Sequence, residues 1–80
     1  MNTYTAVKNR ILQLLGKKKM SIHKLAMESA VAPSSIKNIL YGKSQNPGIV
    51  TIKMLCDGFD ITLVEFFDTE EFRSLEQEIK

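Results

Sequence analysis

Residues 33–41, "PSSIKNILY", carry hydrogen-bonding side chains at a spacing that could do chemistry. Their apolar positions follow a helical period, so one side of the segment is apolar and the other carries Pro33, Ser34, Ser35, Lys37 and Asn38. Serine hydroxyls and the asparagine amide can hydrogen-bond to base edges in a nucleic-acid groove, and proline offers apolar contact to a thymine methyl. Solvated helices usually carry more Glu and Lys. A plain amphipathic helix with a wet polar side remains the alternative.

Basic and polar residues around this helix are candidates for contacts to phosphate. Residues 1–53 carry nine Lys or Arg and one acid, a charge of +8, whereas residues 54–80 carry two basic residues and eight acids, a charge of −6. This split indicates a basic surface for a polyanion and an acidic end, although a short chain can also distribute charge unevenly by chance. The phosphate candidates are Lys17, Lys18, Lys19, Ser21, His23, Lys24, Tyr41 and Lys43.

A series of short helices must position these side chains. Apolar periodicity predicts helices at about 3–15, 21–29, 33–41 and 49–57, with Ile49 among the inward residues of the last. Gly16 and the three lysines after it are expected to end the first helix. Ser21 is a suitable N-cap, and Gly42 suits the left-handed position after the third helix.

Two capping-box patterns predict the end of the fold. Thr62-x-x-Glu65 opens a short fifth helix, and Asp68-x-x-Glu71 opens a last helix that runs to about residue 79. No convincing strand is found. The sequence therefore predicts an all-α domain at residues 1–67, extended by a helical segment at residues 68–80.

The helices at 21–29 and 33–41, joined by a tight turn, form a helix-turn-helix unit whose second helix can lie in the DNA major groove. Residues 20–67 also resemble the Cro/cI-type (XRE) helix-turn-helix family. The resemblance is carried by Leu25-Ala26, Val31, Ile36, Ile39, Gly42-Lys43, Asn46-Pro47, Leu55, Phe59, Ile61 and Leu63-x-x-Phe66-Phe67. It implies a five-helix lambda-repressor-like domain, here with a short C-terminal helix added. It also implies a transcriptional regulator that binds double-stranded DNA as a homodimer.

The chain departs from the family pattern at several positions. Ala30 stands where the turn usually holds Gly, and a positive φ there would cost about 1 kcal/mol. Ile22 replaces a phosphate-contacting Gln. Leu15 and Leu40 stand where many members bury an Arg–Glu pair, and a double change of this kind leaves no orphan charge.

Other functions find little support in the sequence. No nucleophile–base pair or phosphate-binding glycine loop is visible, so we expect no enzyme activity. No cofactor, metal site or small-molecule ligand is expected, because the acids near the C-terminus lack histidine partners and Cys56 is expected to be a core thiol. The single cysteine fits a reducing cytoplasm, where we expect the protein, and the absence of a long apolar run predicts no membrane span.

The C-terminal segment has two interpretations. Phe72, Leu75 and Ile79 form a narrow apolar stripe that could pack on the core or pair with its twin in a homodimer. The sequence thus predicts a small DNA-binding regulator of the repressor type, from a bacterium, phage or mobile element. The alternative is a protein-binding helical module, antitoxin-like or an adaptor, that acts through its acidic C-terminal helix.

Overall fold

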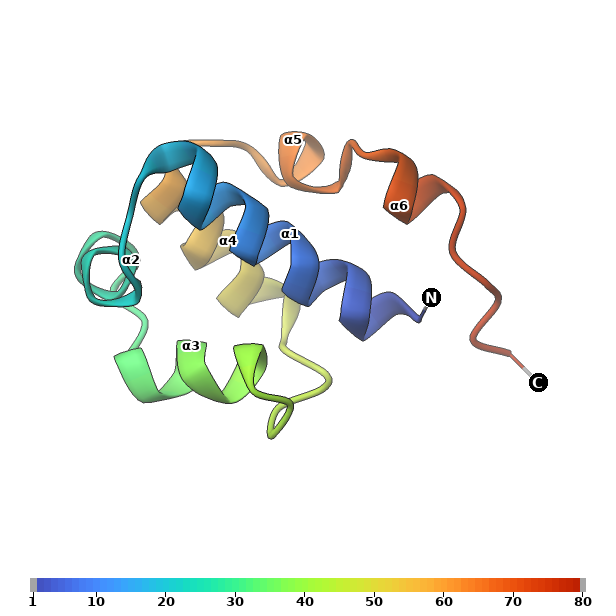
Figure 1. Ribbon diagram of the computed structural model, residues 1–80, viewed down its shortest axis with the longest axis horizontal. Coiled ribbons are helices and arrows are strands. Elements are labelled where there is room, and N and C mark those ends of the chain that lie inside the picture. Colours follow the sequence, from blue (N-terminus) through green and yellow to red (C-terminus); the bar gives the residue numbers. More distant parts are fainter. Residues whose placement is uncertain (1, 80) are drawn as a thin grey trace.

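The computed structural model describes residues 2–79, and within that range it contains helices and turns but no strand (Figure 1). Met1 and Lys80, the outer ends of the predicted ranges 1–67 and 68–80, lie outside the described residues. The all-α prediction is confirmed. The helices are α1 (Thr3–Lys18), α2 (Ile22–Ser29), α3 (Pro33–Leu40), α4 (Ile49–Phe59), α5 (Leu63–Phe67) and α6 (Glu70–Arg73).

The first helix is longer than its sequence predicts. Asn2 caps its start, because the side-chain oxygen accepts a hydrogen bond from the backbone N–H of Thr5 at 2.8 Å. The predicted end at Gly16 is wrong: the helix continues to Lys18, and Lys19 takes the left-handed conformation with φ 54°. The backbone N–H of Lys19 then bonds to the carbonyl of Gly16 at 3.2 Å. A glycine lowers helix stability without ending the helix when the following residues pack or cap it.

Helix α2 packs against α4, and the two are in close contact at Gly58. A Cβ added to Gly58 would lie 2.8 Å from Cβ and 3.1 Å from Cα of Ser29. Ile52, Leu55, Cys56 and Phe59 of α4 are buried. The expectation that Ile49 points inward is wrong, because it lies in the first turn of α4 and is 60% exposed. Burial raises the pKa of the Cys56 thiol, which Lys53 partly offsets.

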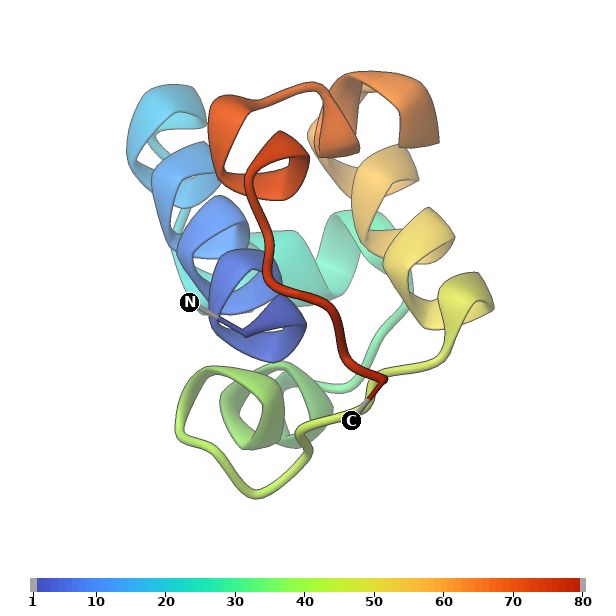
Figure 2. The same ribbon diagram turned by 90° about the vertical axis from the view of Figure 1, so that its right-hand side faces the viewer.

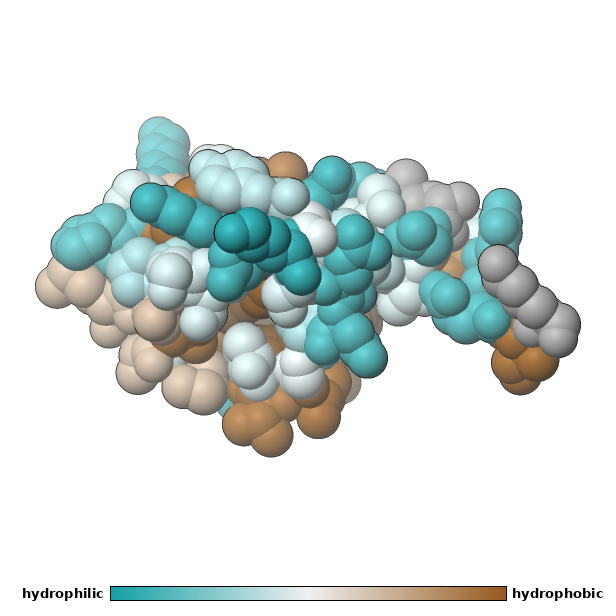
Figure 3. Space-filling model, turned by 90° about the horizontal axis from the view of Figure 1, so that it is seen from below, coloured by the Kyte–Doolittle hydropathy of each residue, from teal (hydrophilic) through white to brown (hydrophobic). Residues whose placement is uncertain are grey.

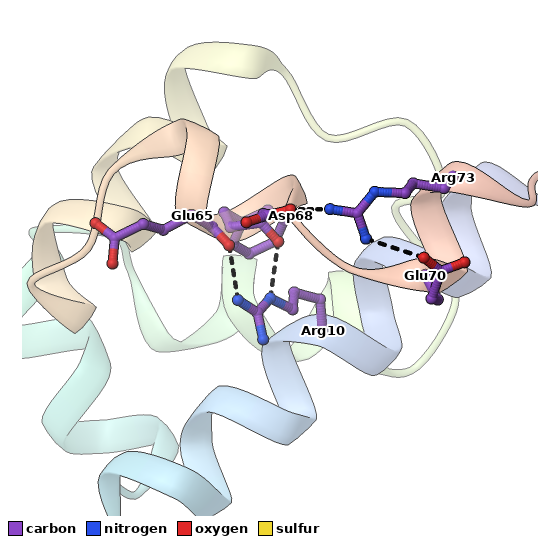
Figure 4. A network of polar contacts seen from close by, with 6 residues as sticks. Arg10, Glu65, Asp68, Glu70 and Arg73 are labelled. Atoms are coloured by element: carbon purple, nitrogen blue, oxygen red, sulfur yellow. Dashed lines mark hydrogen bonds and ion pairs between the residues drawn. The ribbon is translucent and has the colours of Figure 1, made fainter.

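Arginine 10 joins α1 to α5 (Figure 4). Its Nε and Nη2 donate hydrogen bonds of 2.7 Å to the backbone carbonyls of Phe66 and Glu65, in the last turn of α5. The start of α5 has the predicted capping box: Thr62 Oγ1 accepts from Glu65 N–H at 3.0 Å, and Thr62 N–H donates to Glu65 Oε1 at 3.1 Å. This five-residue helix is therefore fixed at both ends.

The predicted last helix to about residue 79 is wrong. Helix α6 ends at Arg73, its N-cap is Thr69 without a side-chain hydrogen bond, and Asp68 pairs with Arg73 instead of opening a capping box. The hydroxyl of Ser74 bonds to the Glu70 carbonyl at 2.9 Å, which favours a helix end. Only part of the predicted extension at 68–80 is thus helical.

Residues 74–79 pass from α6 toward the N-terminus of α1 without helical structure (Figure 2). Glu78 Oε2 accepts hydrogen bonds from the Thr3 backbone N–H at 3.1 Å and from the Thr3 hydroxyl at 2.7 Å. Phe72 packs intramolecularly, with ring centroids 4.9 Å from Phe67 and 6.1 Å from Phe66. The predicted helical stripe is therefore not formed, and its first member belongs to the core.

Residues 2–79 contain neither a membrane-spanning helix nor a cluster of metal-ligating side chains. No helix within residues 2–79 has both the length and the apolar character required to cross a membrane. In the same range, no group of three or more His, Cys, Asp or Glu residues is placed to hold a metal ion.

Candidate nucleic-acid interface

Helix α2, the turn after it and α3 form the predicted helix-turn-helix unit. Ser21 caps α2, with its Oγ accepting from the backbone N–H of Lys24 at 3.0 Å. Ala30 ends α2 in the left-handed conformation with φ 58°, as expected for the family position that usually holds Gly. The buried side chain of Val31 fills the turn, and its N–H donates to Ser29 Oγ at 3.3 Å. Together these contacts set the direction in which α3 leaves the turn.

Helix α3 places its predicted base-contacting residues on the surface. Pro33 occupies its first turn, where a missing N–H costs no hydrogen bond. Ile36, Ile39 and Leu40 are buried and hold the helix against the core. The five outward residues are all exposed: Pro33, Ser34, Ser35, Lys37 and Asn38. The four polar side chains among them form no hydrogen bond or ion pair with another described residue.

Two hollows border α3 and divide these residues. Ser35 and Asn38 line one of about 230 Å³, together with Ser44, Asn46 and Thr51 from the α3–α4 loop and the start of α4. Pro33 lines the other, of about 400 Å³, with His23 and small residues of the turn. Ser44, Asn46 and Thr51 were not proposed as site residues from the sequence. Their polar side chains, close in sequence to the predicted helix, were the signal that could have identified them.

The predicted phosphate-contacting residues are all exposed, but they do not form one cluster. Tyr41, 73% exposed, and Lys43 follow α3 directly. Ser21 and His23 lie at the start of α2, and Lys24 forms an exposed ion pair of 3.0 Å with Glu28. Such a pair contributes little and leaves the lysine available to a stronger anion.

Lys17, Lys18 and Lys19 lie farther from α3 than the other candidates. They occupy the C-terminal end of α1, which lies at the upper edge of the molecule in Figures 1 and 2, whereas α3 forms the lower edge. The structure therefore does not bring the triple lysine together with the outward face of α3, and its contact to phosphate remains a prediction.

The face seen from the side of α3 is mixed in character (Figure 3). Hydrophilic side chains cross its centre, and a hydrophobic patch lies at one edge. The exposed apolar residues at the start of α4 are Ile49 and Val50, at 60% and 69% exposure. The polar central band is the part of this face suited to hydrogen bonding with a groove.

The fold and this surface define a helix-turn-helix DNA-binding domain. Residues 10–71 match the Cro/C1-type HTH DNA-binding domain family, and the chain belongs to that family. The family resemblance expected from the sequence is thus confirmed, as is the lambda-repressor-like, all-helical class of fold.

The chain is similar to a curated regulator and to a solved structure. The HTH-type transcriptional regulator SlrR of Bacillus subtilis (strain 168) is 37% identical over 62 residues, which cover 76% of this chain and 41% of the relative. The chain thus spans less than half the length of that regulator. The crystal structure of the prophage Lp1 protein 11 superimposes with a TM-score of 0.79 at 24% identity, covering 94% of this chain and all of that one, and it shows the shared fold.

Proposed function

We propose that the chain binds double-stranded DNA sequence-specifically, as a small transcriptional repressor that inserts α3 into the major groove. The observation that carries the proposal is the outer face of α3, where four exposed polar side chains have no partner within the described residues. Some charged residues elsewhere on the surface pair with each other, as in Lys53–Asp57 and Arg73–Asp68. Groups left unpaired in this way can bond to base edges without breaking an existing interaction.

The residues would divide their roles by chemistry. Ser34, Ser35, Lys37 and Asn38 would contact bases, with Pro33 against a thymine methyl, and specificity would come from these contacts. Affinity would come from phosphate contacts, in the order of their closeness to α3: Lys43 and Tyr41, then Ser21, His23 and Lys24, and last the triple lysine 17–19. Bound at a promoter, the protein would repress by occupying the duplex that the transcription machinery needs.

We further propose that two copies bind a palindromic site and that the protein works in the cytoplasm of a bacterium. Of the three residues predicted for the dimer interface, Phe72 is occupied by its contacts to Phe66 and Phe67. Leu75 is half-buried and Ile79 is 85% exposed, so these two remain candidates for the dimer interface.

The alternative function is a protein-binding module that acts through an acidic C-terminal helix. It has less support than DNA binding, because α6 spans only four residues.

A fluorescence anisotropy titration tests the proposal. The protein is titrated against mixed-sequence duplex DNA at about 50 and 200 mM salt, and we expect the affinity to fall by orders of magnitude over that range. Duplexes selected from a random pool should then bind at least about 10³-fold more tightly than mixed sequence. Two chains per selected duplex would support the homodimer. A folded protein that binds no duplex at either salt concentration contradicts the proposal.

A further inference from the structure

We propose that Tyr4 is a positioning residue for base recognition, because its hydroxyl fixes the C-terminal end of α3 beside Asn38. This inference rests on the proposed function and deepens it. Tyr4 lies on α1 and its hydroxyl meets the backbone of α3 in a part-buried contact, so it would act through the helix rather than by touching DNA. Its hydroxyl donates a hydrogen bond of 2.5 Å to the backbone carbonyl of Ile39.

The last turn of α3 shows why this bond matters. The final carbonyls of a helix have no partner inside it and must find one elsewhere. The carbonyl of Lys37 accepts from the N–H of Tyr41 at 2.8 Å, and that of Asn38 accepts from the N–H of Ser44 at 2.9 Å. Both donors belong to the loop that follows α3 and would move with it. The Ile39 carbonyl is held by Tyr4 instead, from a different element.

Within the described residues, Tyr4 is the one side chain outside the α3–α4 loop that hydrogen-bonds to α3. The other side-chain bond in this region, from Gln45 Nε2 to the Gly42 carbonyl at 3.1 Å, lies inside the loop itself. At the opposite end, α3 is anchored by the turn and the buried side chain of Val31. The helix is therefore tied to the body of the domain at both ends, and Tyr4 provides the polar contact at the second.

A shift at this end would affect base contacts more than phosphate contacts. Asn38 directly precedes the carbonyl that Tyr4 holds, and bidentate pairing of an amide with a base requires both hydrogen bonds to align. A lysine on a flexible side chain can follow a phosphate through a small displacement. Loss of the Tyr4 hydroxyl should therefore lower discrimination between sequences while leaving general affinity for DNA nearly unchanged.

The variant Tyr4→Phe removes the hydroxyl and keeps the ring. The ring borders a cavity of about 520 Å³ that is also lined by Val7, Ile52 and Phe67. Because the substitution adds no atom, these packing contacts of the ring should be kept. The matched control is Thr62→Ala, which removes the N-cap of α5 on another side of the molecule and is expected to lower stability to a similar degree. A merely structural role would make the two variants behave alike.

The experiment compares each variant with the unmodified protein on one selected duplex and on mixed-sequence duplex, well below the unfolding temperature. For Tyr4→Phe we expect the ratio of the two affinities to fall about three- to tenfold, the range for one weakened hydrogen bond. The salt dependence should stay the same. For Thr62→Ala we expect no change in the ratio. Amide hydrogen exchange gives a second measurement, and at Tyr41 and Ser44 it should accelerate in Tyr4→Phe but not in the control.

Each other outcome is decisive. An unchanged ratio in Tyr4→Phe, or an equal fall in both variants, overturns the positioning role while the proposed function stands. Unchanged exchange at Tyr41 and Ser44 would show that the hydroxyl does not hold this end of α3. If the unmodified protein selects no duplex from the pool, the proposed function itself fails, and the inference fails with it.

Discussion

Asn38 and Lys43 are five residues apart, and the chemistry of their side chains suits them to different parts of a duplex. Both are exposed, and Asn38 lines the hollow between α3 and the α3–α4 loop. An amide that donates and accepts at once can distinguish adenine from the other bases, whereas an ammonium group is attracted equally to every phosphate. At the scale of single residues, sequence reading and general attachment should therefore be separable by substitution.

We predict that Asn38→Ala and Lys43→Ala weaken binding in different ways. Asn38→Ala should reduce discrimination at one base pair by about 1–3 kcal/mol and leave binding to mixed sequence almost unchanged. Lys43→Ala should weaken binding to all sequences alike and lower the salt slope by roughly one unit, as expected for one lost phosphate contact. Titrations on single-base variants of a selected duplex measure both effects. Equal losses on every duplex for Asn38→Ala would contradict its role in base reading.

The sequence could predict the outward residues of α3 but not the residue that holds the helix in place. Ile36 and Ile39 follow the helical period, so the remaining positions had to face outward, and the structure places them there. The bond from Tyr4 to Ile39 joins residues 35 positions apart, and no local pattern encodes it. The same limit applies to Arg10, which counted only as a positive charge in the sequence but holds two carbonyls of α5.

At the scale of helices, two glycines differ in their surroundings: Gly16 has free space around it, and Gly58 lies at a contact between two helices. Gly16 lies inside α1, and a Cβ added there would meet no atom within 4 Å. Gly58 lies inside α4 at its crossing with α2, where an added Cβ would lie 2.8 Å from Cβ of Ser29. The helix propensity of the two sites is similar, so packing between elements alone distinguishes them.

We predict opposite effects for the same substitution at these sites. Gly16→Ala should raise the free energy of unfolding by about 0.5–1 kcal/mol, because alanine has the higher helix propensity. Gly58→Ala should lower it by about 1–3 kcal/mol, because α2 and α4 must separate to admit the methyl group. Urea unfolding followed by circular dichroism measures both. A stabilising Gly58→Ala would show that α2 can shift without loss and that the close approach is unimportant.

Helix ends were the least predictable feature at the level of elements. The ends marked by strong caps, such as Ser21 and the Thr62–Glu65 box, were predicted from sequence and are confirmed. The end expected at Gly16 was wrong because the helix continues for two more residues and is capped by a left-handed Lys19, whose N–H bonds to the Gly16 carbonyl. The C-terminal segment was overpredicted, because a helical apolar period without a core to bury it does not stabilise a helix.

At the scale of the whole molecule, the two oppositely charged parts of the sequence meet near the end of α3. Residues 74–79 return from α6 to the N-terminus of α1, and Glu78 lines the same cavity as Gln45 and Asn46 of the α3–α4 loop (Figure 2). This loop begins just after α3 and includes Lys43, a proposed phosphate contact. Acidic groups at this place would repel an approaching phosphate backbone, within a screening distance of about 10 Å at 0.1 M salt.

We therefore predict that removing negative charge from residues 74–79 strengthens binding to DNA. The double variant Glu76→Gln/Glu78→Gln should bind mixed-sequence duplex roughly threefold more tightly at about 50 mM salt, since a charge pair 10 Å apart in water contributes a few tenths of a kcal/mol. Glutamine at position 78 keeps an oxygen that can accept the two hydrogen bonds from Thr3.

The matched control is Glu70→Gln/Glu71→Gln, which removes the same charge from α6, at the opposite edge of the molecule from α3 in Figure 1. If proximity to the loop matters, the control should change affinity less than the first variant, and the difference should shrink at about 200 mM salt because screening is stronger. Anisotropy titrations of both variants at the two salt concentrations measure this. Equal gains in both would instead mean that only net charge counts, and the path of residues 74–79 would then have no influence on DNA binding.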